Sequence, residues 1–316
     1  MAGKTLIFTV CTAEHYPFAQ ALADSLPKEL TFKVGMVGEV AAGELDVVHF
    51  RELPFEVIPE MHQRYDKPAL LAAAKPFFAR YFLQQNGIEN VIYFDPTTFI
   101  FGDFDDILQK STTYDIVLTP RLTRKFGKST YGDEKMFLNT GMYDNGFFAL
   151  RKSQNTFHFL EWWQQRLTDR AYLDLCNGMN HDQLWLNYVP ILFENNCIYK
   201  NIGWNVGMQN LHERVLTFKD NKWVVNLSEP LLFFNFKECL EEGTEVKKMI
   251  KDSGATKLLS GYKERLKQYT AVIPPVFSLR KSLHSPDSAF RKGLKDTLRT
   301  IVDTITYFPI YHKISK

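Results

Sequence analysis

The most constraining feature of the sequence is an alternation, from the first residues onward, between short apolar runs and longer segments with helical spacing. Residues 5–10 form a run of apolar and β-branched side chains. A segment follows in which Phe18, Leu22 and Leu26 recur every fourth residue, and then two more apolar runs at 31–37 and 46–50. This alternation is typical of an α/β fold, in which helices flank a mostly parallel sheet and ligands bind at the carboxyl ends of the strands.

The same pattern continues through the middle of the chain. Residues 90–94 form an apolar run that ends at Asp95, and further runs occupy 115–120 and 146–150. An acidic residue directly after a buried strand needs a partner or a ligand, so Asp95 is a candidate site residue. Residues 121–140 are polar and mixed in character, which predicts a mobile loop over a site.

Three helices are expected between and after these strands. The first would begin at Lys75-Pro76, because proline suits the first helical turn, and would end near 86–87. The second would be capped by Ser153. The third would be opened by His181-Asp182-Gln183 and would end before Pro190.

Charge is distributed unevenly along the 316 residues, although the formal net charge is only +2. Residues 257–316 carry 12 Lys/Arg and four Asp/Glu, whereas residues 1–256 carry 26 and 32. Apolar residues in 285–308 recur at helical spacing opposite basic ones, which predicts a basic amphipathic helix. The sequence therefore predicts two parts, a body at 1–256 and a basic, largely helical C-terminal extension at 257–316. The extension would contact an anionic membrane, pair with a partner, or be a packed or solvated helix.

Several classes of protein are excluded by what the sequence lacks. No run approaches the roughly 20 apolar residues of a membrane-spanning helix. The run at 6–10 is too short for the core of a signal peptide, and the four cysteines form no CxxC motif, so a cytoplasmic protein is expected. The loop Thr12-Ala13-Glu14 does not match the glycine-rich fingerprint of dinucleotide-binding enzymes, and no P-loop is present. We expect no nucleic-acid partner.

The order of the motifs resembles that of bacterial GT-A glycosyltransferases of the family 8 type, over roughly residues 5–240. Tyr93-Phe94-Asp95-Pro96-Thr97 is similar to that family's version of the DxD motif. Residues 141–147 resemble the family's YNxGF strand, and residues 181–187 resemble its DQ helix. Residues 203–214 resemble its GYNVA…NL…R segment, and residues 230–236 resemble its FHF strand.

The resemblance implies a Rossmann-like GT-A domain at 1–256 that takes a nucleotide-diphosphate sugar, with a UDP-sugar as the expected donor. The sugar would pass, with retention of configuration, to a glycan or lipid-linked acceptor. Asp182 and Gln183 would be the catalytic residues on the acceptor side. The residues expected to bind the donor are Thr12, Ala13, Lys75, Arg80, Asp95, Thr97, Asp144 and Asn145.

Metal binding is the point at which the sequence departs from the family pattern. Such enzymes hold Mn²⁺ or Mg²⁺ with oxygen and imidazole ligands, and the cation bridges the donor's phosphates. Asp95 and Asn235 are the candidate ligands, but Thr97 replaces the motif's second acid and Asn235 replaces a histidine. Three alternatives stay open: weak metal binding, replacement of the metal by cations such as Lys75 or Arg80, or an inert GT-A domain that binds a nucleotide or acts as a scaffold.

Overall fold

The computed structural model describes residues 4–39, 43–125, 131–175, 178–241 and 243–276, together with 297, 298 and 301. The chain divides into two compact units, Met1–Phe277 and Ser278–Lys316. Residues 257–277, which the sequence assigns to the C-terminal extension, belong to the first unit. Most of the predicted amphipathic helix at 285–308 lies outside the described residues, so its contact with a membrane stays a prediction.

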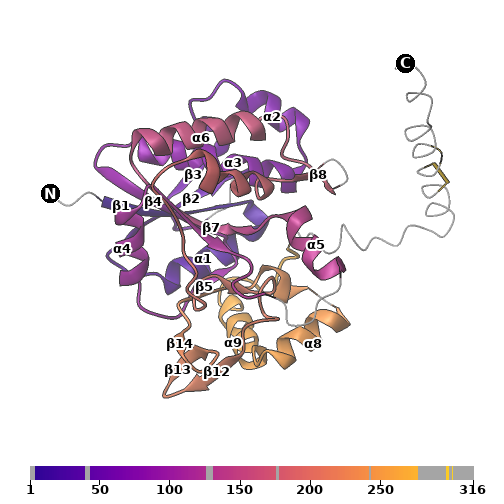
Figure 1. The fold of residues 1–316 in the computed structure, drawn as a ribbon. Helices are drawn as coiled ribbons and strands as arrows, with labels where there is room; N and C mark the ends of the chain where they lie inside the picture. Colours follow the sequence, from indigo (N-terminus) through magenta and orange to yellow (C-terminus); the bar gives the residue numbers. More distant parts are fainter. Residues whose placement is uncertain are drawn as a thin grey trace. The chain divides into compact units, whose positions relative to one another are not determined.

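A seven-stranded sheet forms the centre of the first unit, in the order β10-β6-β7-β4-β1-β2-β3 (Figure 1). Each neighbouring pair is parallel except that β7 runs antiparallel to both β4 and β6. The mostly parallel α/β sheet predicted from the sequence is therefore confirmed. Its strands are β1 (Lys4–Cys11), β2 (Thr31–Met36), β3 (Val47–His49), β4 (Ile88–Phe94), β6 (Ile116–Pro120), β7 (Tyr143–Arg151) and β10 (Asn196–Ile198).

Helices cover both faces of this sheet (Figure 1). One face carries α3 (Lys67–Leu83) and α6 (Gln154–Leu167), and the other carries α1 (Tyr16–Ser25) and α4 (Asp105–Thr113). Ser153 caps α6 as predicted, because its hydroxyl accepts a hydrogen bond from the Thr156 amide at 3.1 Å. The other α-helices are α2 (Ile58–Arg64), α5 (Tyr131–Thr140), α7 (Val189–Leu192), α8 (Thr244–Asp252) and α9 (Thr256–Leu266).

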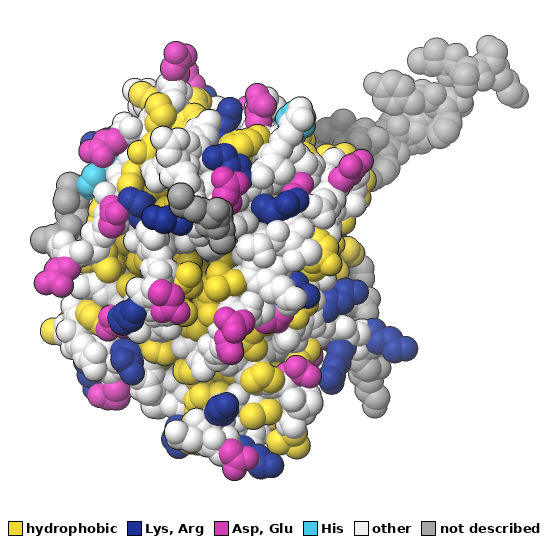
Figure 2. All heavy atoms as spheres, turned by 90° about the vertical axis from the view of Figure 1, so that its left-hand side faces the viewer, with side chains coloured by type: hydrophobic (Ala, Val, Ile, Leu, Met, Phe, Trp, Pro, Cys, Tyr) yellow, Lys and Arg dark blue, Asp and Glu magenta, His cyan; other side chains and the backbone are white. Residues whose placement is uncertain are grey.

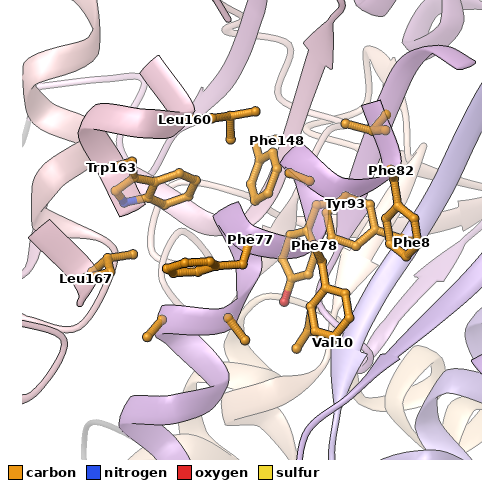
Figure 3. Packing of buried hydrophobic residues seen from close by; sticks show 14 of the residues in the cluster. Phe8, Val10, Phe77, Phe78, Phe82, Tyr93, Phe148, Leu160, Trp163 and Leu167 are labelled. Carbon is orange, nitrogen blue, oxygen red and sulfur yellow. The ribbon is translucent and has the colours of Figure 1, made fainter. Parts of the chain in front are cut away.

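The continuous apolar runs of the sequence follow from burial of the sheet on both faces. Along β1, Phe8 faces the cluster beneath α3 and α6, whereas its neighbour Ile7 faces the cluster beneath α1 and α4. Figure 3 shows the first cluster, in which Tyr93 stacks on Phe148 at 4.9 Å between ring centroids. Trp163 of α6 meets Phe148 edge-on at 5.5 Å and is fully buried. These aromatic contacts fix the helices against the strands that lead into the site.

Helix α3 begins earlier than the sequence predicts, at Lys67 instead of Lys75. The Asp66 carboxylate caps it by accepting a hydrogen bond from the Ala69 amide at 3.0 Å, and Pro68 occupies its first turn. The predicted start at Lys75-Pro76 is wrong, because Pro76 lies inside the helix. The helix continues past it because the surrounding alanine and phenylalanine side chains are buried in the core.

Two further predictions need correction. Residues 121–140 are not a loop throughout, because their second half forms α5, whose Phe137 is buried beside the Arg121 guanidinium. The segment after His181 forms only a short 3-10 helix, η4 (Leu184–Tyr188), which runs directly into α7. Pro190 therefore lies in the first turn of α7 and does not mark the end of the predicted helix.

Smaller sheets extend the fold beside the strand ends. One of them is a three-stranded sheet in the order β11-β15-β5. It places Asn235 opposite Thr98 and so brings residues 230–236 to the end of β4. Its strands are β5 (Thr98–Ile100), β11 (Val206–Gly207) and β15 (Phe233–Asn235). The remaining strands are β12 (Leu216–Lys219), β13 (Lys222–Val225), β14 (Glu229–Pro230), β8 (Leu173–Asp174) and β9 (Met179–Asn180).

On the face shown in Figure 2, cationic and anionic side chains are interspersed with apolar ones. Within the described ranges, none of the helices combines the length and the apolar character needed to cross a bilayer.

Candidate functional site

The candidate site begins where β1 and β4 end side by side. These strands are parallel, and Phe8 pairs with Tyr93, so Thr12 and Asp95 follow the two strands at the same edge of the sheet. Thr12 is buried, and its hydroxyl lies 3.1 Å from Nδ1 of His15 within η1 (Ala13–His15). Ala13 is half-buried at the start of that turn. The predicted nucleotide loop and the predicted acidic motif therefore adjoin.

Asp95 is held by the residue that replaces the second acid of the motif. Its Oδ1 accepts hydrogen bonds from the Thr97 amide at 3.0 Å and from the Thr97 hydroxyl at 2.6 Å. The same hydroxyl lies 2.9 Å from Oδ1 of Asn235. All three residues are at most 8% exposed. The structure thus brings the two candidate metal ligands, Asp95 and Asn235, together through Thr97.

A lysine that the sequence analysis did not select completes this group. Lys237 opens the 3-10 helix η5 (Lys237–Leu240), and its Nζ lies 3.5 Å from Oδ2 of Asp95. The lysine side chain is 39% exposed, whereas that of Asp95 is 7% exposed. The only signal in the sequence is a cation two residues after Asn235.

The electrostatics of this pair favour charge on both partners. Burial alone would raise the pKa of Asp95, but attraction to Lys237 and the hydrogen bonds from Thr97 outweigh it, so the pKa lies below its ordinary value. Burial would lower the pKa of Lys237, but attraction to Asp95 and Asp182 outweighs it and raises the pKa. The site therefore holds a carboxylate beside an ammonium at neutral pH.

The start of β7 forms the wall next to Asp95. The Asp95 amide donates to the Gly146 carbonyl at 2.8 Å, and the Gly146 amide donates to Oδ1 of Asp144 at 2.7 Å. A Cβ at position 146 would lie 2.6 Å from Nδ2 of Asn235 and 2.7 Å from Oδ1 of Asp144. Glycine is therefore required here by the close approach of two polar side chains, although its backbone is not strained.

The acceptor side is organised around a second lysine–aspartate pair. Nζ of Lys75 donates to Oδ2 of Asp182 at 2.8 Å and to the Asn145 carbonyl at 3.0 Å. Nδ2 of Asn145 donates to Oδ1 of Asp182 at 2.6 Å. The side chain of Asp182 is fully buried and that of Lys75 is 7% exposed. In this conformation Asp182 binds Lys75 and Asn145 and does not face solvent.

Gln183 lies at the edge of the same group. Its Nε2 donates to the Thr140 carbonyl, and its Oε1 accepts a longer hydrogen bond from the Asn145 amide at 3.4 Å. Gln183 is 8% exposed, whereas Asn145 is half-buried. The predicted residues Asn145, Asp182 and Gln183 are therefore brought together, from β7 and from the turn before η4.

Arg80 is placed differently from the other predicted donor-binding residues. Its Nη1 donates to Oε1 of Gln164 at 2.9 Å, and its guanidinium lies over the Phe55 ring at 5.8 Å. Neither partner is among the predicted site residues. The geometry therefore connects Arg80 with the packing of α3 against α6.

The side chains near Asp95 do not fit a divalent cation well. Mg²⁺ and Mn²⁺ prefer several oxygen ligands, usually including more than one carboxylate. Here one oxygen of Asp95 accepts two hydrogen bonds from Thr97 and the other lies 3.5 Å from Nζ of Lys237, while Oδ1 of the nearby Asp144 accepts the Gly146 amide. Oδ1 of Asn235 accepts the Lys237 amide at 3.0 Å. In the part of the chain that the structure describes, no group of three or more His, Cys, Asp or Glu residues could hold a metal ion.

Comparison with known proteins agrees with this architecture. No known protein family matches the chain. The uncharacterized protein YfnF of Bacillus subtilis (strain 168) is 26% identical over 196 residues, which span 61% of this chain and 64% of YfnF, less than two thirds of its length. Among solved structures, this chain is similar to the galactosyltransferase LgtC, which was determined in complex with donor and acceptor sugar analogs. The two superpose with a TM-score of 0.52 at 12% sequence identity, over 84% of this chain and 97% of LgtC. The narrower resemblance to family 8 stays a prediction. The fold is that of the GT-A nucleotide-diphospho-sugar transferases.

Proposed function

We propose that this chain is a glycosyltransferase that moves a sugar from a nucleoside-diphosphate sugar to a hydroxyl group of a glycan or a lipid-linked acceptor. One observation supports it above all. Polar side chains from five separate segments of a GT-A fold lie at one edge of the sheet, where open α/β sheets bind their ligands. They are Thr12, Asp95, Thr97, Asp144, Asn145, Gln183, Asn235 and Lys237.

In the proposed reaction, the bond between the anomeric carbon and the diphosphate oxygen breaks, and its electron pair stays on that oxygen. A new bond forms between the anomeric carbon and the acceptor hydroxyl oxygen, and the hydroxyl proton passes to the released diphosphate. The products are a glycoside and a nucleoside diphosphate. A UDP-sugar donor and retention of configuration belong to this proposal as expectations from the family resemblance.

The burial of each residue supports a division of roles. Gln183 and Asn145 lie at the boundary of the acceptor-side group, so we assign to them the contacts with sugar hydroxyls. Asp182 is fully buried and hydrogen-bonded to Lys75 and Asn145, so we assign to it a positioning role. Thr12 and Ala13 would meet the nucleotide at the end of β1.

A second candidate is an inert GT-A domain that binds a nucleotide without turning it over. The observation that favours it is the replacement of two expected metal ligands by Thr97 and Asn235. Both candidates predict nucleotide binding, so only turnover separates them.

The test combines calorimetry with a turnover assay. UDP, GDP, CDP and their common sugars would be titrated with and without Mn²⁺, and release of free sugar from each donor would then be followed. Binding with slow donor hydrolysis supports the transferase, whereas binding without turnover favours the inert domain. The site variant Asp95→Asn should change the nucleotide affinity, because it removes the carboxylate beside Lys237, whereas Asp103→Asn, on an exposed turn, should not. Absence of binding by every nucleotide under both conditions would contradict the proposal.

A further inference from the structure

We propose that Lys237 takes the place of the divalent cation, so that this site binds the donor's diphosphate without a metal ion. The inference rests on the proposed glycosyl transfer and names the group that balances the charge of the leaving diphosphate. Neither Lys75 nor Arg80, the cations that the sequence suggests for this purpose, is placed to do so.

The two lysines of the site differ in what their ammonium groups contact. An ammonium group has three N–H donors. Lys75 directs two of them to Asp182 and to the Asn145 carbonyl, and its Nζ also lies 5.0 Å from the centre of the Tyr93 ring. Lys237 lies 3.5 Å from Asp95, which is longer than a good hydrogen bond, and its side chain is 39% exposed. Lys75 is therefore buried with two of its three donors engaged, whereas Lys237 has donors to offer a ligand.

Thr97 and Asn235 form one hydrogen-bonded unit with the backbone of Lys237. The Thr97 hydroxyl contacts both Asp95 and Asn235, and Oδ1 of Asn235 accepts the backbone amide of Lys237. A histidine or an aspartate at these positions would be suited to a cation. A threonine and an asparagine instead fix the turn from which Lys237 extends. The two substitutions thus support the lysine and remove ligands from the metal.

The charges in the site also favour Lys237. Asp95, Asp144 and Asp182 face Lys75 and Lys237 in this site, and all three carboxylates raise the pKa of Lys237. A diphosphate brings further negative charge, which increases when the bond to the sugar breaks. An ammonium beside Asp95 can turn toward that charge, because its own carboxylate partner holds it loosely. It stabilises the departing oxygen electrostatically and transfers no proton.

The experiment is a calorimetric titration of the full chain with UDP, GDP, CDP, ADP and inorganic pyrophosphate, each in EDTA and in Mn²⁺. We expect at least one nucleoside diphosphate to bind in EDTA, within about threefold of its affinity in Mn²⁺. Lys237→Met should reduce that affinity by about 10- to 100-fold, the usual effect of losing a charge-assisted hydrogen bond. Lys237→Arg should retain most of it.

The control is Lys33→Met, which removes a lysine–aspartate pair, with Asp46 at 2.6 Å, on the β2 strand. This variant should bind as the wild type does. The wild-type titration needs no variant, so a folding defect in Lys237→Met cannot obscure the result. Binding of a nucleotide only in Mn²⁺ would overturn the role of Lys237 and leave the glycosyltransferase proposal intact. Unchanged affinity in a folded Lys237→Met would also overturn it. Binding under neither condition would contradict the proposed function itself.

Discussion

Two lysine–aspartate pairs lie in the same site and differ in almost every physical respect. Lys75 and Asp182 are 2.8 Å apart, with side chains 7% and 0% exposed. Lys237 and Asp95 are 3.5 Å apart, with side chains 39% and 7% exposed. We call Lys75–Asp182 the closed pair, because Nζ of the lysine and both oxygens of the aspartate have protein partners. We call Lys237–Asp95 the open pair, because the lysine side chain is partly exposed.

The difference separates a structural pair from a ligand-binding pair. Breaking a buried pair leaves an unpaired charge in a poorly solvated place, which is costly. A loosely held, partly exposed ammonium costs little to redirect, because water or a ligand replaces its partner. We therefore expect variants of the closed pair to affect folding and variants of the open pair to affect binding.

The largest effect is expected from Lys75→Met. This change leaves the fully buried Asp182 without its cation, so we expect the free energy of unfolding to fall by about 3–5 kcal/mol. Chemical denaturation followed by circular dichroism measures it. The double variant Lys75→Met/Asp182→Asn should recover much of the loss, because it removes both charges. A loss below about 1 kcal/mol in the single variant would place this pair with surface ion pairs.

A smaller loss of stability is expected from Gly146→Ala, which changes the wall of the site formed by the start of β7. The added methyl group would lie 2.6 Å from Asn235 and 2.7 Å from Asp144, and must displace both side chains. Inserting a methyl group into a packed site typically costs about 1–3 kcal/mol. Denaturation and nucleotide titration should both show the change.

The matched control for that variant is Gly261→Ala in α9. A Cβ at position 261 meets nothing within 4 Å, so alanine should leave binding unchanged and stabilise the helix by about 0.5–1 kcal/mol. Equal effects of the two substitutions would show that the contacts around Gly146 do not organise the site.

The sequence predicts only one member of the open pair as a site residue. The sequence predicts Asp95 because a buried apolar run ends at it, and that local pattern needs no knowledge of the rest of the chain. It does not predict Lys237, because the position of this lysine depends on the pairing of β15 with β5, which places Asn235 opposite Thr98. Nothing in the local sequence fixes this pairing.

The sequence does not predict the closed pair, for the same reason. Lys75 and Asp182 are 107 positions apart, and no local pattern links the two residues. The start of α3 was misplaced because Lys75-Pro76 and Lys67-Pro68 give the same local signal. Only the cap at Asp66 and the burial of the intervening residues decide between them. Local patterns thus predict strands and their ends, whereas long-range pairs require the fold.

A pH-dependent effect is expected next to the closed pair. Burial lowers the pKa of His181 below 6.5, although the Ala171 carbonyl and Asp182 favour its protonated form, and Lys237 and Lys75 also lower it. The unfolded state therefore binds the proton more readily than the folded state. The contribution of His181 to the free energy of unfolding is fully present above pH 6.5 and is lost as the pH falls toward the folded-state pKa.

The test is a pH series of unfolding free energies for the wild type and His181→Asn. Asparagine tolerates the positive φ of 48° at this position, so the backbone should be retained. We expect the variant to lose less stability than the wild type between pH 7 and 5. If the unfolding free energies of the two proteins change in parallel with pH, or if the wild type gains stability in acid, burial does not lower the pKa of His181 and the prediction is wrong.

The smallest effect on stability is expected from Lys237→Met. The Lys237 side chain is partly exposed and its Nζ lies 3.5 Å from its partner, and Asp95 keeps both hydrogen bonds from Thr97, so the loss should stay within about 1 kcal/mol. Measured beside Lys75→Met in the same buffer, this variant tests the comparison directly. If the two substitutions cost the same, both pairs are structural and the lysine beside Asp95 is not available to a diphosphate. If Lys237→Met folds almost as well as the wild type yet binds nucleotide poorly, the site keeps one lysine for its architecture and the other for its ligand.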